Sequence, residues 1–364
     1  MLKLIFMINH ITIENFKSIK TMDLDLLRIN VLIGANGVGK SNFISFFKFL
    51  NHLYEKNIQN YVARQGGANN ILHFGLKNSS FLKSEIVFDR NRYRINLNST
   101  NQGNLIVNFE SVDYYDSMIG GWKNNPYNTN GLEVEALTDF SGYRYDYTRE
   151  YFNSFQIYHF HDTSETAKIK QKCNINDNKS LKEDGSNLAA FLYFLKEMHP
   201  KNFAKIEASV RSIAPYFDGF DLTPDRINNN FITLEWKEKN FQEMYLNASH
   251  FSDGTLRFIA LATLLLQPKP PQTIIIDEPE LGLHPFAINK LAALIQKASA
   301  NRQIIISTQS VNLVDNFEAE DIITVDRKDN QSVFHRQNSE NLKDWLENYS
   351  LSDLWSKNVI GGRP

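Results

Sequence analysis

The stretch that decides the fold is Gly34-Ala-Asn-Gly-Val-Gly-Lys-Ser41, which matches G-x-x-x-x-G-K-[ST] at every fixed position. An apolar strand is expected before it at 29–33, and a helix with apolar residues at helical spacing is expected after it, from Ser41 to about residue 54. Glycines let successive N–H groups face one concavity, and the helix N-terminus adds its dipole. The stretch therefore predicts a phosphate-binding loop.

Two side chains of this loop are suited to a nucleoside triphosphate with its magnesium ion. Lys40 can reach the β- and γ-phosphates, and the Ser41 hydroxyl can bind Mg²⁺. We therefore expect ATP and Mg²⁺ as the cofactors. The residues expected to bind ATP here are Gly34, Ala35, Asn36, Gly37, Val38, Gly39, Lys40, Ser41 and Asn42.

A second stretch, Thr273-Ile-Ile-Ile-Asp277-Glu278-Pro279, reads as an apolar strand that ends in two adjacent acids. Ligands of open α/β sheets bind at the carboxyl ends of the strands. We expect Asp277 to hold Mg²⁺ directly or through water, and Glu278 to orient and deprotonate an attacking water.

The rest of the C-terminal third has the regular alternation of an α/β fold. Helices are expected at 255–266 and 286–299, and strands at 273–277, 303–307 and 321–326. Continuous isoleucine runs in two of the strands indicate a parallel sheet that is covered on both faces. Earlier in the chain, 84–98 reads as a β-hairpin, and 186–198 and 201–213 read as helices.

Composition limits the remaining possibilities. The chain has 364 residues, 42% of them hydrophobic, which is enough for a sizeable core. Its 39 Lys and Arg against 41 Asp and Glu exclude a histone-like polycation but permit a local basic patch. A single cysteine, Cys173, excludes a disulfide framework and fits a reducing compartment. The apolar stretches 1–8 and 258–266 are too short to span a bilayer, so we expect a cytoplasmic protein without a membrane partner.

Further segments resemble the RecF/SMC-like and OLD-like branch of the ABC ATPases. Ile11-Thr-Ile-Glu-Asn-Phe-Lys-Ser-Ile19 resembles the opening segment of that branch, and Phe251-Ser-Asp-Gly-Thr-Leu-Arg257 resembles its signature motif. Glu280-Leu-Gly-Leu-His-Pro285 resembles the loop after the second acid, and the last residues resemble the ending of a group of bacterial predicted ATPases. The resemblance implies a P-loop ATPase head with a mainly parallel sheet core, an antiparallel β lobe and an inserted helical lid.

The resemblance also implies an assembly and a division of the chain. Two heads would pair head-to-tail as a homodimer that ATP closes, with Ser252, Asp253 and Gly254 of one chain contacting the nucleotide of the other. The expected parts are 1–89 and 251–364, which together form the ATPase core, and 90–250, an inserted β and helical region.

This chain departs from the family at the switch position, where ABC ATPases usually have histidine. The strand 303–307 is followed by Thr308 and Gln309. Gln309 can hydrogen-bond a γ-phosphate or a water but cannot carry a proton, so we expect slow or gated turnover. The resemblance also suggests Lys17 and Gln65, the latter as a Q-loop candidate, near the nucleotide. His159 and His161 alternate with aromatic residues on one expected strand and are not expected to bind a metal.

The process that the ATPase serves stays open. The first possibility is a DNA-linked head ATPase of repair or anti-phage systems that signals through a separately encoded effector protein. Its phosphate-contacting surface could be Arg92 and Arg94, with Arg90 nearby, or the strip Lys168, Lys170 and Lys172, although an ordinary solvated face is the preferred interpretation of both.

A transport ATPase and a self-contained nuclease are the second and third possibilities. A transporter's nucleotide-binding subunit would have a much shorter interval than the roughly 210 residues between the phosphate loop and the signature here. An OLD-like nuclease would need a Toprim domain, and fewer than 40 residues follow the strand expected at 321–326. From this we expect no intrinsic nuclease activity.

Overall fold

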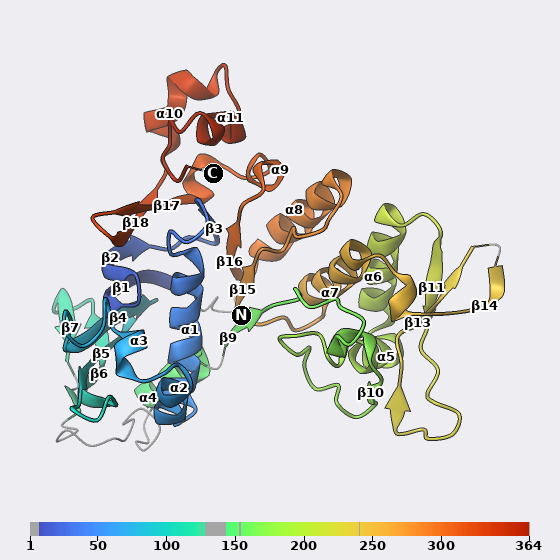
Figure 1. Ribbon diagram of the computed structural model, residues 1–364, viewed down its shortest axis with the longest axis horizontal. Coiled ribbons are helices and arrows are strands. Elements are labelled where there is room, and N and C mark those ends of the chain that lie inside the picture. Colours follow the sequence, from blue (N-terminus) through green and yellow to red (C-terminus); the bar gives the residue numbers. More distant parts are fainter. Residues whose placement is uncertain (1–6, 125, 128–142, 153, 240, 364) are drawn as a thin grey trace.

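The structure is a computed structural model that describes residues 7–124, 126–127, 143–152, 154–239 and 241–363. The apolar start of the chain, residues 1–6, lies outside the described residues. Figure 1 shows a central sheet, an antiparallel lobe on one side of it and a helical region on the other. No helix in the described part of the chain is both long and apolar enough to cross a bilayer.

The six-stranded central sheet carries the phosphate loop. Its strand order is β18-β17-β3-β16-β15-β9, and every neighbouring pair except β17 and β18 is parallel. Ile274 and Ile276 pack in one hydrophobic core while Ile275 packs in the other, because alternate side chains of a strand point to opposite faces. The expected parallel core is confirmed. The strands are β3 (Ile29–Ile33), β9 (Phe155–Tyr158), β15 (Thr273–Asp277), β16 (Gln303–Thr308), β17 (Ile322–Lys328) and β18 (Gln331–Arg336).

Helix α1 (Lys40–Tyr54) covers one face of the central sheet and joins it to the antiparallel lobe (Figure 1). Its buried Phe43, Phe46 and Phe47 lie in the same core as Ile11 and Ile86 of the lobe. The lobe orders its strands β2-β1-β4-β5-β6-β7, and β8 also pairs with β6. These are β1 (Ile8–Phe16), β2 (Ile19–Asp25), β4 (Phe81–Phe88), β5 (Asn91–Ser99), β6 (Leu105–Asp116), β7 (Gly121–Lys123) and β8 (Pro126–Tyr127). Helices α2 (Ile58–Arg64), α3 (Ala68–Ile71) and α4 (Tyr143–Phe152) complete this side.

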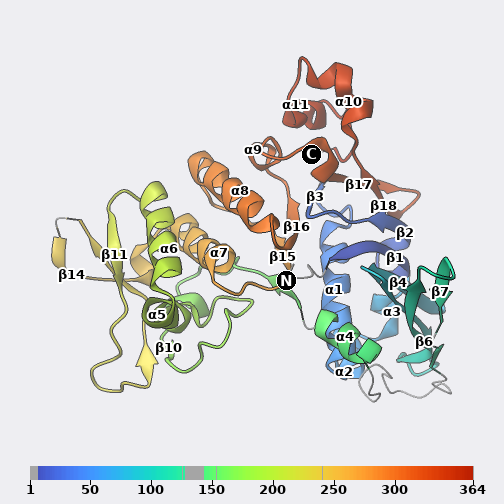
Figure 2. The ribbon, with the colours of Figure 1, turned by 180° about the vertical axis from the view of Figure 1, so that it is seen from behind.

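Helices α7 and α8 lie on the opposite side of the central sheet from α1, as the view from behind in Figure 2 also shows. Beyond them lie α5, α6 and small sheets of the helical region. The helices are α5 (Leu188–Met198), α6 (Pro200–Ile213), α7 (Asp253–Leu266) and α8 (Pro285–Ser299). The strands are β10 (Cys173–Asn174), β11 (Phe217–Asp221), β12 (Phe231–Ile232), β13 (Glu235–Glu238) and β14 (Phe241–Asn247).

Sheet membership differs from the expected three-part division at two places. Residue 90 lies in the turn between β4 and β5, which are paired strands of one sheet. Strand β9, from the expected insertion, pairs with β15 as the edge of the central sheet. It ends at Tyr158, so His159 and His161 follow the strand and do not lie on it as expected.

The last residues of the chain return to the phosphate loop. After α9 (Val311–Val314), α10 (Ser339–Leu346) and α11 (Leu351–Ser356), the backbone at Gly362 passes so close to β3 that a Cβ there would lie 3.2 Å from the carbonyl oxygen of Ile33. The Gly362 N–H donates to both carboxylate oxygens of Asp326, at 3.0 and 2.9 Å. The indole N–H of Trp355 donates to the Gly362 carbonyl.

We expect Trp355→Ala to lower the free energy of unfolding by about 3–5 kcal/mol, since it removes a fully buried indole and leaves a cavity. Chemical denaturation followed by circular dichroism measures the change. The matched control is Trp345→Ala, because Trp345 is 45% exposed. Equal denaturation midpoints for the two variants would contradict the expectation.

Candidate nucleotide-binding site

The phosphate loop occupies the turn between β3 and α1, as the sequence predicts. Gly34 and Gly39 have φ of 154° and 118°, and a Cβ at Gly34 would lie 2.4 Å from the carbonyl oxygen of Val325. Residues with a Cβ avoid such φ values, and here there is also no room for one. Lys40 is the first residue of α1, so the loop leads directly into a helix N-terminus, which favours anions.

Two serines from distant parts of the chain support this loop. The Ser332 hydroxyl, on β18, donates to the carbonyl oxygen of Val38 at 2.5 Å and lies 2.6 Å from the Ser18 hydroxyl. Ser18 in turn accepts a hydrogen bond from the Asn42 side chain at 2.7 Å. A Cβ at Gly39 would lie only 2.0 Å from the Ser332 oxygen, so glycine is required for this close approach. The sequence predicted neither serine, because no local pattern links residues 18 and 332.

The side chain of Lys40 is turned into the loop. Its Nζ donates to the carbonyl oxygens of Gly34 and Ala35, at 2.5 and 3.0 Å, and the residue is only 5% exposed. Burial lowers the pKa of Lys40, and the nearby carboxylates, Glu278 first, act in the opposite direction. Lys40 is thus close to the point where it would meet the outer phosphates.

A cavity of about 130 Å³ lies above the loop and joins it to the predicted catalytic residues. Glu278 and Gln309 form its other wall. The structure therefore brings together residues that are more than 230 positions apart in the sequence. The cavity is lined by Asn36, Gly37, Gly39, Lys40, Ser41, Asn42, Glu278 and Gln309.

Asp277, the last residue of β15, fits the predicted magnesium role. Its Oδ1 is buried and has no hydrogen-bond partner among the described residues, so a lone pair is available. Buried carboxylate oxygens are normally paired, and Mg²⁺ binds through one or two carboxylates with the phosphates completing its shell. The Ser41 hydroxyl would be the second protein ligand.

Glu278 faces Gln309, the residue at the switch position. Its φ of 43° lies in the left-handed region, which costs a residue with a Cβ about 1 kcal/mol. The side-chain amide of Gln309 donates to its Oε1. The backbone N–H of Glu278 donates to the carbonyl oxygen of Ser307 at 2.8 Å, so the start of this loop is tied to β16. An acid at this place can accept a proton from an attacking water.

His161 has a structural partner at the same loop. Its Nε2 donates to the carbonyl oxygen of Asp277 at 2.7 Å, so that nitrogen carries the proton. Among the described residues, no group of three or more His, Cys, Asp or Glu side chains is arranged to hold a metal ion.

The signature segment, 251–257, begins helix α7. Ser252 is the N-cap, and its hydroxyl oxygen accepts the N–H of Thr255 at 3.2 Å. Gly254 packs against the loop after Glu278, where a Cβ would lie 2.2 Å from the carbonyl oxygen of Gly282. Ser252, Asp253 and Gly254 do not line the phosphate cavity of their own chain.

Arg257 ties the signature helix to two neighbouring loops, a role the sequence did not reveal. Its guanidinium donates to the carbonyl oxygens of Phe160 (3.1 Å), His161 (2.6 Å) and Leu281 (2.7 Å). A planar guanidinium serves several acceptors in fixed directions, which a lysine ammonium does not.

We expect Arg257→Lys to destabilise the fold by about 2 kcal/mol, because two or more charge-assisted hydrogen bonds to carbonyls are lost. Thermal unfolding of the purified variant measures this. Arg64→Lys, at an exposed position, is the control, and an equally small shift for both variants would contradict the expectation.

Lys17 and Gln65 lie outside the phosphate cavity. The Lys17 ammonium donates to the Ser45 hydroxyl at 3.0 Å, one turn beyond Ser41 on α1, and burial lowers its pKa. Gln65 is an exposed residue at the end of α2. Their part in ATP binding stays a prediction.

Comparisons with known proteins agree with this geometry. Residues 29–315 match the family described as "AAA domain, putative AbiEii toxin, Type IV TA system". The Old nuclease of Escherichia phage P2 is 23% identical over 380 residues, which cover 93% of this chain and 62% of that protein. The chain thus spans less than two thirds of the length of that relative. ABC transporter A family member 11 of Dictyostelium discoideum is 35% identical over 84 residues, or 23% of this chain and 9% of the transporter.

Solved structures of Smc heads share the fold. The Smc head bound to the C-winged helix domain of ScpA has a TM-score of 0.55 at 17% identity and covers 92% of this chain and 99% of its own. An Smc head with an extended coiled coil, bound to the C-terminal domain of ScpA derived from Pyrococcus furiosus, has a TM-score of 0.56 at 15% identity, covering 94% and 99%. Because the family match extends over most of the chain, the protein belongs to this AAA domain family, and it has the fold of the Smc heads.

Proposed function

We propose that the protein binds and hydrolyses ATP as a head-to-tail dimer and acts as a switch in a DNA-linked process, anti-phage defence or DNA repair. A separately encoded effector would receive the signal. The single observation that carries the enzymatic part is the cavity in which the phosphate loop faces Glu278 and Gln309. We place the protein in the cytoplasm.

The residues of the cavity divide the chemistry between them. The loop N–H groups and Lys40 would hold the phosphates, and Mg²⁺ held by Ser41 and Asp277 would neutralise their charge. Glu278 would orient a water and take its proton. Gln309, whose amide contacts Glu278, can align that water but cannot carry a proton, so turnover is expected to be slow.

The position of the signature supports the dimer. Ser252 and Gly254 do not line the phosphate cavity of their own chain, which is expected if they contact a nucleotide held by another chain. A two-fold pairing completes two sites at once. ATP that binds only the paired form would stabilise the dimer by mass action.

Mixing two inactive variants tests this arrangement. Lys40→Ala removes the phosphate contact, and Ser252→Arg blocks the signature, so each protein alone should lack turnover. A mixed dimer retains one intact composite site, and equal mixing should restore about a quarter of wild-type activity if the sites act independently. Absence of recovery, with both variants folded, would contradict the head-to-tail dimer.

The two arginines of the antiparallel lobe, Arg92 and Arg94, make contacts within the chain itself. Arg92 and Arg94 form ion pairs with the fully buried Asp113, both at 2.8 Å, and the Arg92 guanidinium lies over the Trp122 ring at 4.4 Å. The hydrogen bonds that Ser111 and both arginines donate lower the pKa of Asp113 against its burial. Reversing these arginines would strand a buried carboxylate, so they are poor probes of DNA binding.

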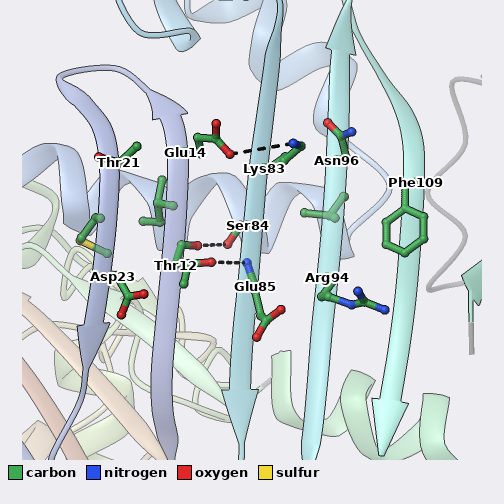
Figure 3. A pocket seen from close by; sticks show the side chains of 13 residues that line it. Thr12, Glu14, Thr21, Asp23, Lys83, Ser84, Glu85, Arg94, Asn96 and Phe109 are labelled. Carbon is green, nitrogen blue, oxygen red and sulfur yellow. Dashed lines mark hydrogen bonds and ion pairs between the residues drawn. The ribbon is translucent and has the colours of Figure 1, made fainter. Parts of the chain in front are cut away.

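The outer face of this lobe is not uniformly basic. A cavity of about 530 Å³ lies across β2, β1, β4, β5 and β6. Its lining includes Glu14, Asp23 and Glu85 beside Lys83 and Arg94, as Figure 3 shows. Acids in this number would repel a phosphate backbone. The lysine strip is also engaged: Lys168 pairs with Asp184 at 3.3 Å, Lys170 with Asp253 at 3.5 Å, and Lys172 lies over Phe231.

A direct assay tests the DNA link without relying on either strip. We expect linear double-stranded DNA to raise the ATPase rate of the wild-type protein at low salt and to lose this effect at several times higher salt, since phosphate contacts release counterions. If DNA neither stimulates the ATPase nor binds the protein at low salt, the DNA-linked role is contradicted. The ATPase proposal is not affected by that result.

The second candidate is the nucleotide-binding subunit of a transport or other non-DNA complex. The 84-residue similarity to ABC transporter A family member 11 favours it. Copurification of the tagged protein from its host distinguishes the two, because a transport subunit would be recovered with membrane proteins and a DNA-linked switch with its effector.

A further inference from the structure

We propose that Glu280 is the positioning residue of the switch: its carboxylate holds the backbone at Gln309 so that the Gln309 amide meets Glu278. This inference rests on the proposed hydrolysis. It assigns a task to an acid that follows the predicted magnesium ligand Asp277 and the predicted general base Glu278 but does not line the phosphate cavity.

The hydrogen bonds that the Glu280 carboxylate accepts come from the end of β16. Its Oε1 accepts the Thr308 hydroxyl at 2.5 Å and the backbone N–H of Gln309 at 3.1 Å. The Thr308 oxygen in turn accepts the N–H of Ser310 at 3.0 Å. One carboxylate therefore fixes, directly or through one hydroxyl, residues 308–310 at the end of the strand.

Gln309 needs such an anchor because its side chain is exposed. The amide of Gln309 donates to Glu278, and several torsions of the glutamine must be fixed for that contact to persist. Because Glu280 holds the backbone at Gln309, only the side-chain torsions of Gln309 remain to be fixed. A misplacement of about 1 Å in a catalytic contact can lower turnover by about two orders of magnitude.

The Glu280 carboxylate is buried, and the loss of its hydration costs free energy. Burial raises its pKa, and its Oε2 is buried with no hydrogen-bond partner among the described residues. Stability alone does not explain a half-satisfied buried acid, because an apolar side chain of the same size would avoid the desolvation cost. Control of the switch is the function that its two donors indicate.

The loop that carries Glu280 also touches the signature segment. The N–H of Leu283 donates to the Glu280 carbonyl at 2.9 Å, and the next contacts along the loop are those of Gly282 with Gly254 and of Leu281 with Arg257. The position of the switch and the position of the signature are thus fixed by one short loop of the same chain.

The test compares Glu280→Ala and Glu280→Gln in steady-state ATPase assays. We expect Glu280→Ala to lower kcat about 10–100-fold with KM for ATP changed less than about twofold, because the phosphate loop is untouched. Glu280→Gln keeps an oxygen that accepts both hydrogen bonds, and we expect kcat within about threefold of wild type. In a Gln309→Ala background, Glu280→Ala should have no further effect on kcat.

Glu320 offers a matched control. Its carboxylate also accepts a backbone N–H and a hydroxyl, both from Ser339, but it lies directly before β17 and does not line the cavity. Glu320→Ala should lower the midpoint of thermal unfolding and leave kcat unchanged. If Glu280→Ala does not fold, Thr308→Val removes one of the two donors and should lower kcat about 3–10-fold.

The outcomes separate this inference from the proposed function. An active wild type whose kcat is unaffected by Glu280→Ala, or is lowered equally by Glu320→Ala, would overturn the role of Glu280 alone. A persistent effect of Glu280→Ala in the Gln309→Ala background would do the same. A wild-type protein without ATPase activity would overturn the proposed function instead.

Discussion

Glu278→Gln is expected to lower ATP turnover at least about 100-fold while ATP binding persists. A positioned general base accounts for rate factors of this size, and the amide cannot take the proton of the attacking water. The substitution keeps the size of the side chain and an oxygen that can still accept the Gln309 amide hydrogen bond. Lys40 and the phosphate loop are unchanged, so nucleotide affinity should be preserved.

The same variant should accumulate as an ATP-dependent dimer, since nucleotide that is not hydrolysed keeps stabilising the paired form. Size-exclusion chromatography with and without Mg-ATP measures this, and a filter-binding assay measures ATP affinity. Glu347→Gln, at an exposed position, is the control. Turnover within about tenfold of wild type would contradict the role of Glu278, and monomers under saturating ATP would contradict the dimer.

Gly254→Ala should abolish most activity through a single methyl group. The Cβ would lie 2.2 Å from the carbonyl oxygen of Gly282 and 3.1 Å from its carbon, both backbone atoms that no side-chain rotation can move. We expect a loss of about 1–3 kcal/mol of stability from overpacking. The signature or the neighbouring loop must shift to relieve the clash, and we expect kcat to fall about 10–100-fold as the contacts to the nucleotide misalign.

Gly121→Ala is the matched control for this change. A Cβ at Gly121 would have no other atom within 4 Å, so the same methyl group should alter neither stability nor turnover there. Thermal unfolding and ATPase assays of the two variants side by side give the comparison. Equal activity of both variants would show that the signature tolerates the shift.

Local patterns predicted the central sheet well for a physical reason. The isoleucine runs of β15 and β16 are buried on both faces, as their continuous apolar character predicts, and the glycines before Lys40 define the turn between strand and helix. The strands at the edges of the two large sheets were predicted less well. Strand β9 is a short strand of four residues, and β2 follows β1 after a tight turn, so neither has the continuous apolar signal of the centre.

Some residues of the candidate site could be predicted from the sequence and others could not. The phosphate loop and the two adjacent acids are local motifs whose chemistry depends on neighbours in sequence, and both were predicted with their strands. The roles of Ser332, Arg257 and Glu280 were not predicted, because they depend on partners brought close only by folding. Ser332 reaches Ser18 across 314 residues, and Arg257 reaches Phe160 across 97.

The sequence by itself determined that this chain builds a glycine-rich loop between a strand of a parallel sheet and a helix, with two acids at the end of a neighbouring strand, and it predicted that the loop binds phosphate. Those features arise from the period-two burial of strands and from the conformational freedom of glycine, which act over a few residues. Only the tertiary structure decided which polar groups are satisfied. It paired Arg92 and Arg94 with Asp113, and it left Asp277 Oδ1 without a partner among the described residues. It also placed the Glu280 carboxylate against the backbone of Gln309. The physical reason is that a buried polar atom depends for its hydrogen bonds on the distant segment that packs against it.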